Sequence, residues 1–163
     1  MSRAFVKEGD GALDPLPDLP MSPHPNYVTP RGLAALQLRL AARQGDLAAL
    51  KSRPDRLDKL PEAAAERDIR YLEARLRSAI LTDPAALPLT EVAFGLRVTV
   101  SDRTTYEITG EDEADATLHR IAPQSPLARA LMGAQVGDEV IWRKPSGPVT
   151  LTILAIAHAD PPP

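Results

Sequence analysis

Residues 29–50 read TPRGLAALQLRLAARQGDLAAL, and this stretch decides the first half of the fold. Thr29 offers an N-cap oxygen, and Pro30 presets the backbone φ angle at the first helical position. Five leucines then follow the 3-4-7-3 spacing of a coiled-coil seam in which Arg43 holds the missing position: Leu33, Leu36, Leu40, Leu47 and Leu50. The stretch therefore predicts a coiled-coil helix, and Gly45 predicts a bend or fraying beyond Gln44.

A second helix is predicted after a short turn. Pro54 and Pro61 bracket this turn, which we place at 52–60. Beyond it, apolar residues again recur at helical steps: Ala65, Ile69, Leu72, Leu76 and Ile80. Asp83-Pro84 ends the helix. Two apolar seams joined by a short turn predict an antiparallel helical hairpin.

Beyond Thr90 apolar residues recur at every second position, which is typical of strands. Leu96, Val98 and Val100 alternate with polar residues, and a second alternating run follows at 105–109. The other predicted elements are a third strand at 118–121, a short helix from Pro126 capped by Ser125 and closed by Gly133, and strands at 138–143 and 149–157. This order predicts a compact α+β domain.

The N-terminal segment holds five prolines among glycine and aspartate and has no apolar period, so it predicts a flexible or extended arm. Its apolar residues offer ways to dock along the folded part: Phe5, Val6, Leu13, Leu16 and Leu19. The predicted organisation is a Pro-rich arm at 1–26, a coiled-coil hairpin at 27–82, a linker at 83–89, the α+β domain at 90–158 and a tail at 159–163.

Composition narrows the class of protein. The 163 residues carry a formal charge of −3 and no cysteine, which excludes disulfides, a thiolate nucleophile and thiolate metal sites. We find neither a membrane-spanning apolar run nor a secretion signal, and therefore expect a cytoplasmic protein without membrane contact. The three histidines lie in different predicted elements, and no catalytic order or phosphate-binding loop is present, so we expect no enzyme activity.

Three acidic residues lie close to the predicted hairpin turn: Asp55, Asp58 and Glu62. Carboxylates at the end of a projecting arm can hold a divalent cation inside a partner's active site. In the alternative interpretation, Asp55 and Glu62 serve as caps and helix-dipole partners of the second helix. Basic residues interleave with them, at Arg53, Arg56 and Lys59, and this favours the alternative. We therefore predict no metal site of the chain's own.

Short motifs in both predicted parts match one known family. Residues 124–133 read QSPLARALMG, and VGDEV at 136–140 and a Pro-Ser-Gly turn follow. Upstream lie YVTPRG at 27–32, RDIRYL at 67–72 and GEDEAD at 110–115. Together these motifs resemble the bacterial GreA/GreB transcription elongation factors over about residues 27–158, with RDIRYL similar to the GreB form of the second helix.

The resemblance implies an FKBP-like antiparallel-sheet domain with one short helix, which docks on bacterial RNA polymerase at the mouth of the secondary channel. The coiled coil enters the channel, and acidic residues at its tip share a magnesium ion with the polymerase, which cleaves backtracked RNA. The chain then has no cofactor of its own. Residues implied in docking are Gln124, Ser125, Pro126, Arg129, Glu113 and Asp115, and Arg67 and Arg70 are candidates for contact with the channel or nascent RNA.

The hairpin tip departs from the family pattern. The acidic tip signature of the family is absent between Asp46 and Glu66, and the hairpin is shorter by about two heptads in total, or roughly 10 Å of reach. We therefore predict a polymerase-binding regulator with weak or no stimulation of transcript cleavage, with classical cleavage stimulation as the alternative. A generic helical adaptor is a third interpretation. A peptidyl-prolyl isomerase is a remote one, because the domain has only three aromatic residues to line such a pocket: Phe94, Tyr106 and Trp142.

Overall fold

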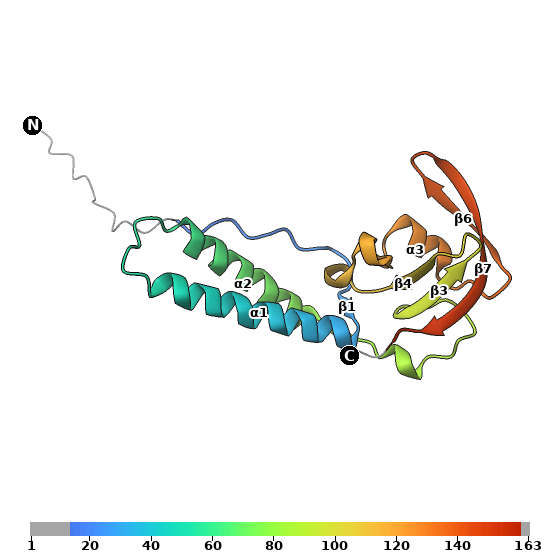
Figure 1. Cartoon of the computed structure of the whole chain (residues 1–163), viewed down its shortest axis with the longest axis horizontal. Coiled ribbons are helices and arrows are strands. Elements are labelled where there is room, and N and C mark those ends of the chain that lie inside the picture. The colour runs from blue at the N-terminus through green and yellow to red at the C-terminus, as the bar shows by residue number, and fades with distance from the viewer. Residues whose placement is uncertain (1–13, 161–163) are drawn as a thin grey trace, which may run out of the picture.

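The computed structural model describes residues 14–160 and has two parts, a projecting helical hairpin and a curled sheet with a short helix on one face (Figure 1). Each part has its own small apolar core, around Leu36 and Leu72 in the hairpin and around Val98, Ile108 and Ile153 in the sheet domain. The predicted docking residues Phe5, Val6 and Leu13 lie outside the described residues.

The first helix, α1, spans Pro30–Lys51 and begins at the predicted cap. Thr29 Oγ1 accepts a hydrogen bond from the backbone N–H of Gly32 at 3.0 Å. The helix continues through Gly45, so the predicted bend is wrong. A β-carbon at Gly45 would meet no atom within 4 Å, so this glycine lies on an open face of the helix. Its weak helix propensity does not end the helix because good helix formers flank it on both sides.

The second helix, α2, spans Leu60–Ser78 and packs antiparallel against α1 (Figure 1). Their apolar seam is tightest near the base of the hairpin, where Leu36 and Leu72 are each 2% exposed. Further out, Arg43 occupies the polar position of the seam, and its Nε donates to Asp68 Oδ2 of α2 at 3.1 Å. An ion pair thus bridges the two helices where the leucine spacing is interrupted.

The base of the hairpin is closed by two short strands that the sequence did not reveal. Strand β1 (Tyr27–Val28) pairs in parallel with β2 (Ile80–Leu81). Ile80 was predicted inside the second helix, but α2 ends at Ser78. The backbone N–H of Ile80 instead donates to the carbonyl of Asn26 at 2.8 Å. This pairing holds the entry and the exit of the hairpin side by side.

Five strands form the sheet of the second part, in the order β5-β4-β3-β7-β6. Their bounds are Leu96–Val100 (β3), Thr105–Ile108 (β4), Arg120–Ile121 (β5), Glu139–Lys144 (β6) and Gly147–His158 (β7). A short 3-10 helix, η1, spans Pro84–Ala86 in the linker. Within this sheet the pairs are antiparallel except β4 and β5, which are parallel. The predicted α+β class is confirmed, and the sheet is mixed rather than wholly antiparallel.

The predicted third strand is two residues shorter than expected. Leu118 ends a 3-10 helix, η3 (Ala116–Leu118), and His119 has a positive φ of 53° that a strand cannot accommodate. The short helix α3 (Pro126–Leu131) is confirmed, with the Ser125 hydroxyl accepting from the Ala128 N–H at 3.2 Å. Gly133 follows it at φ 79°, as its predicted closing role requires.

The described part of the arm, residues 14–26, is extended and runs along α2 (Figure 1). It contacts α2 through Leu16, Asp18 and Leu19, two of which are among the predicted docking residues. Among the described residues, no helix combines the length and apolar character needed to cross a membrane.

Candidate functional site

The hairpin tip, residues 52–62, pairs its most buried carboxylate with an arginine. Glu62 lies in the first turn of α2 and is only 6% exposed. Arg56 holds it with two parallel bonds, Nε to Oε1 at 2.9 Å and Nη2 to Oε2 at 2.6 Å. This bidentate contact keeps the pKa of the Glu62 carboxyl below its usual value. The carboxylate is therefore neutralised within the tip itself.

The two aspartates of the tip stabilise the turn. Asp55 Oδ1 accepts from the N–H of Leu57 at 3.1 Å, and Asp58 Oδ1 accepts from the N–H of Leu60 at 2.9 Å. Each bond is the local side-chain-to-backbone contact by which aspartate favours turns. Leu57 is 93% exposed at the outermost loop, so an apolar side chain occupies the end of the hairpin.

These residues do not fit a magnesium site. Magnesium needs several oxygen ligands converging on one point, and the described residues contain no group of three or more acidic or histidine side chains that could hold a metal ion. Asp55, Asp58 and Glu62, predicted as a set, each have a different local partner.

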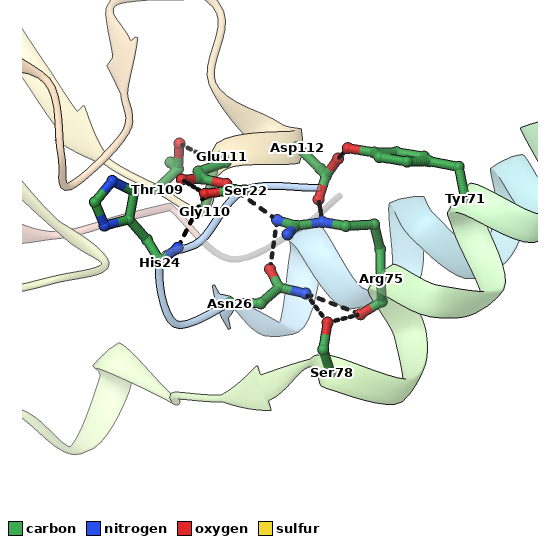
Figure 2. Close-up of polar contacts among 10 residues, drawn as sticks. All are labelled: Ser22, His24, Asn26, Tyr71, Arg75, Ser78, Thr109, Gly110, Glu111 and Asp112. Atoms are coloured by element: carbon green, nitrogen blue, oxygen red, sulfur yellow. Dashed lines mark hydrogen bonds and ion pairs between the residues drawn. The ribbon is translucent and has the colours of Figure 1, made fainter. Parts of the chain in front are cut away.

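The junction between the two parts contains a second acidic group that is far more enclosed. Its centre is Arg75 of α2, whose side chain is 2% exposed (Figure 2). Arg75 Nε donates to Asp112 Oδ2 at 2.5 Å, and Nη2 donates to Asn26 Oδ1 at 2.7 Å. The hydroxyl of Tyr71 donates to the other Asp112 oxygen at 2.9 Å. We call Asn26, Tyr71, Arg75, Glu111 and Asp112 the junction network; Glu111 accepts from Arg75 at a longer 3.4 Å.

A second arginine bridges the same junction from α1. Arg31 Nε donates to Glu113 Oε1 at 2.5 Å, and its Nη2 pairs with Glu107 of β4. Thr29 Oγ1 donates to the other oxygen of Glu113 at 2.7 Å. The acidic 3-10 helix η2 (Glu111–Glu113) is therefore held from both helices of the hairpin. Two charge groups, one buried around Arg75 and one partly buried around Arg31, fix the hairpin to the sheet domain.

Two glycines allow this close approach, one from each part. A β-carbon at Gly110 would lie 2.6 Å from the carbonyl oxygen of Tyr27. A β-carbon at Gly32 would lie 2.7 Å from Glu113 Oε2. Both distances are below a normal carbon–oxygen contact. A side chain at position 110 would push backbone against backbone, and one at position 32 would displace the Glu113 carboxylate from its present place.

The predicted docking residues fall into two groups. Ser125 caps α3, while Pro126 and Arg129 are exposed on the same corner of the sheet domain. Gln124 precedes them, and its Oε1 is buried with no hydrogen-bond partner among the described residues. Glu113 lies elsewhere, in the junction, with its side chain 7% exposed.

Asp115 and the two predicted contact arginines also have local partners. Asp115 Oδ1 accepts from Thr117 N at 2.9 Å and Thr117 Oγ1 at 2.6 Å, and these bonds lower the pKa of its carboxyl. Arg67 Nη2 donates to Asp68 at 2.7 Å. Arg70 is bound by the N-terminal arm, through Asp18. The structure thus brings Gln124, Ser125, Pro126 and Arg129 together and leaves the other predicted residues apart.

Sequence reasoning missed the junction network. One signal was present, because Arg75 interrupts the apolar stripe of α2 next to Leu72 and Leu76. A charged residue on a buried stripe predicts a buried partner. The partner lies 37 residues away in the acidic stretch at 110–115, and nothing in the spacing connects the two.

The architecture defines a class: a two-part protein in which a helical hairpin is rigidly fixed to, and projects from, a mixed α+β domain. A family profile described as "Transcription elongation factor, GreA/GreB, C-term" matches residues 87–158. The transcription elongation factor GreA of Streptococcus thermophilus is 34% identical over 125 residues, which cover 74% of this chain and 77% of that protein. The chain belongs to the GreA/GreB family.

Other relatives match over shorter regions. GreA of Pseudomonas putida is 35% identical over 103 residues, covering 60% of this chain and 64% of that protein. The chain matches between 60% and 64% of the length of this relative and those from Halorhodospira halophila and Francisella philomiragia. The solved GreA/GreB factor from Nitrosomonas europaea covers 82% of this chain and 99% of its own, at 21% identity and a TM-score of 0.39. That structural likeness is too weak to support a conclusion.

Proposed function

We propose that this chain is an RNA polymerase-binding elongation regulator that acts at the secondary channel and stimulates transcript cleavage weakly or not at all. Membership of the GreA/GreB family supports the polymerase as partner, since its curated relatives are named transcription elongation factors. In this proposal the polymerase performs any RNA cleavage, the chain brings no cofactor, and the protein works in the cytoplasm with the polymerase.

The arrangement of the hairpin tip carries the proposal. A factor that lends metal ligands needs free carboxylate oxygens placed to within about 0.5 Å. Here Arg56 occupies both oxygens of Glu62, and the two aspartates are bonded to the turn backbone. The 22-residue α1 is about 33 Å long at 1.5 Å per residue, and in this proposal that reach is too short to bring the tip to a metal in the channel. The tip would therefore occupy the channel without completing a metal site.

The junction supports a role in which the hairpin is aimed rather than loosely attached. The buried Arg75 connects α2 to η2 of the sheet domain, and the partly buried Arg31 connects α1 to η2. A domain docked at the channel mouth would then set the direction of the hairpin. This direction is needed for a short hairpin to enter a narrow channel.

Cleavage of stalled, backtracked elongation complexes in the presence of magnesium tests the proposal. We expect this chain to add little cleavage and to slow the cleavage produced by a competent GreA relative, because both would compete for one channel. The variants Asp55→Ala and Asp58→Ala should change neither result, and Glu139→Ala on β6 is the matched control. Robust cleavage that Asp55→Ala or Asp58→Ala abolishes, with Glu139→Ala unaffected, would show that the tip does deliver a metal.

Docking is tested separately at the corner formed by Ser125, Pro126 and Arg129. A proline at the first helical position presents a fixed apolar corner, so Pro126→Glu should weaken polymerase binding several-fold. Pro148→Glu, at an exposed proline of β7, is the matched control. Unchanged affinity of a folded Pro126→Glu variant would place the interface elsewhere on the domain.

A further inference from the structure

We propose that residues 14–22 form a displaceable strap that covers one face of α2 and opposes insertion of the hairpin into a closed binding site while it is docked. The docking of the strap is a property of the chain alone. Its inhibitory effect rests on the proposed function, because it needs a partner that encloses the hairpin.

In the part of the chain that the structure describes, the hydrogen bonds between the strap and α2 are made by Arg70. Arg70 Nε donates to Asp18 Oδ1 at 2.7 Å, and Arg70 Nη2 donates to the carbonyl of Leu16 at 2.8 Å. The guanidinium of Arg70 thus donates one hydrogen bond to a carboxylate and one to a carbonyl of the strap. The acidic strap thereby neutralises a positive charge that α2 would otherwise present.

The contact is open to solvent and incompletely packed. The Arg70 side chain is 39% exposed and that of Asp18 is 75% exposed. Leu19 is half-buried beside Tyr71, between cavities of about 330 Å³ and 360 Å³. Exposed ion pairs contribute little stability and are screened by salt. The strap is therefore held weakly enough to detach without unfolding the hairpin.

The other end of the strap is anchored firmly. Ser22 Oγ donates to Glu111 at 2.8 Å, and the buried Asn26 donates from Nδ2 to the carbonyl of Arg75 at 2.8 Å. Within the described residues, detachment of the segment between 14 and Ser22 would leave this anchor in place. Prolines at 15, 17 and 20 keep the segment extended in the free state, which reduces the entropy lost when it docks again.

The strap is expected to oppose insertion because of the face of α2 that it covers. The wall of the second cavity joins Asp18 and Leu19 of the strap to Arg70, Ala74 and Arg77 along one stripe of α2. A docked strap adds a third chain to the hairpin and widens it at this point. A partner that encloses the hairpin has to displace the strap. Its apparent affinity is then the intrinsic affinity multiplied by the fraction of molecules in which the strap is released.

A nitroxide label on the strap tests docking directly. The chain has no cysteine, so Pro17→Cys accepts a single label. In the full chain we expect the label to broaden the amide signals of residues 70–77 of α2. The double variant Asp18→Ala/Leu19→Ser should recover most of that intensity, while Asp14→Ala, which removes an exposed strap charge, should not. Absence of broadening in the labelled parent chain, or equal broadening in the double variant, would overturn the docked strap.

Polymerase affinity tests the inhibitory role with the same variants. We expect Asp18→Ala/Leu19→Ser to bind polymerase about threefold to tenfold more tightly than Asp14→Ala, because the released fraction rises toward one. Equal affinities of the two variants, with the label showing release, would overturn inhibition. If neither variant nor the parent chain binds polymerase, the proposed function and the inhibitory role both fail, and the label result alone decides whether the strap docks.

Discussion

The hairpin tip and the junction both pair acidic residues with arginine, yet they differ in how much water reaches the arginine. At the tip, Arg56 is 38% exposed and pairs with one glutamate, while the aspartates bind the turn. At the junction, Arg75 is 2% exposed and depends on protein partners for all its contacts. The same residue types therefore form a solvent-exposed ion pair at the tip and a buried structural contact at the junction.

The strongest way to separate the two regions is to remove each arginine. Arg75→Met should lower the free energy of unfolding by about 3–5 kcal/mol, because it leaves the Asp112 carboxylate without its buried partner. Arg56→Met at the tip should cost far less, since water replaces the guanidinium. Urea denaturation compares the two variants. Similar losses would contradict the distinction drawn between tip and junction.

A smaller effect is expected from the tyrosine of the junction network. Tyr71→Phe should cost about 1–2 kcal/mol, because Asp112 loses one hydrogen bond in a partly enclosed site. Burial and the neighbouring Asp112 raise the pKa of Tyr71 above its ordinary value of 10.0. Its contribution to stability is therefore complete below that pH and is lost as the pH rises through the folded-state pKa. The stability advantage of the parent chain over Tyr71→Phe should therefore be constant near neutral pH and shrink as the pH rises above 10, which urea denaturation at a series of pH values measures.

Gly45, in the outer half of α1, should accept alanine with a gain in stability. Gly45→Ala should raise the free energy of unfolding by about 0.5–1 kcal/mol, because the helix is continuous and the added methyl meets nothing. Gly133→Ala is the matched control and should destabilise, since Gly133 has a φ of 79°. Thermal melting measures both changes. A loss for Gly45→Ala would show that the helix is interrupted there in solution.

The smallest expected effect is the acid response of the tip. The hydrogen bonds from Arg56 lower the pKa of Glu62 from its ordinary 4.5. The stability that Glu62 contributes is therefore present above that pH and is lost as the pH falls through the folded-state pKa. Between pH 7 and pH 3 the parent chain should lose slightly more stability than Glu62→Gln. Glu139→Gln, at an exposed site, should follow the parent chain.

Local chemistry made much of the fold predictable. The cap at Thr29, the leucine seam of α1 and the capped start of α3 each depend on residues within one or two turns of each other. The predictions that failed concern residues whose conformation depends on partners far away in the sequence. Ile80 left the helix to pair with Asn26, more than 50 residues away, and His119 adopted a positive φ at a turn whose geometry depends on its neighbours in space.

The candidate site divides in the same way. The pairing of Glu62 could be interpreted from sequence because Arg56 lies six positions from it. The predicted capping of α2 by Asp55 was wrong, since Lys59 is the N-cap and Asp55 binds the N–H of Leu57 in the turn.

The junction could not be interpreted from sequence, since Arg31 and Glu107 are 76 residues apart and meet only once both parts have folded. The binding of Arg70 by the arm was equally hidden, because an extended segment carries no periodic signal.

The two glycines of the junction give the hairpin a mechanical property. Gly110 and Gly32 let backbone and carboxylate meet with no side chain between them, at the pivot of an arm about 33 Å long and roughly 10 Å wide. A displacement at the base of the hairpin becomes about three times larger at the tip, because the arm is about three times as long as it is wide. Adding one methyl group, which needs roughly 1 Å of clearance, would therefore swing Leu57 through about 3 Å. These two missing side chains therefore set the direction in which the hairpin points as well as letting the two parts pack.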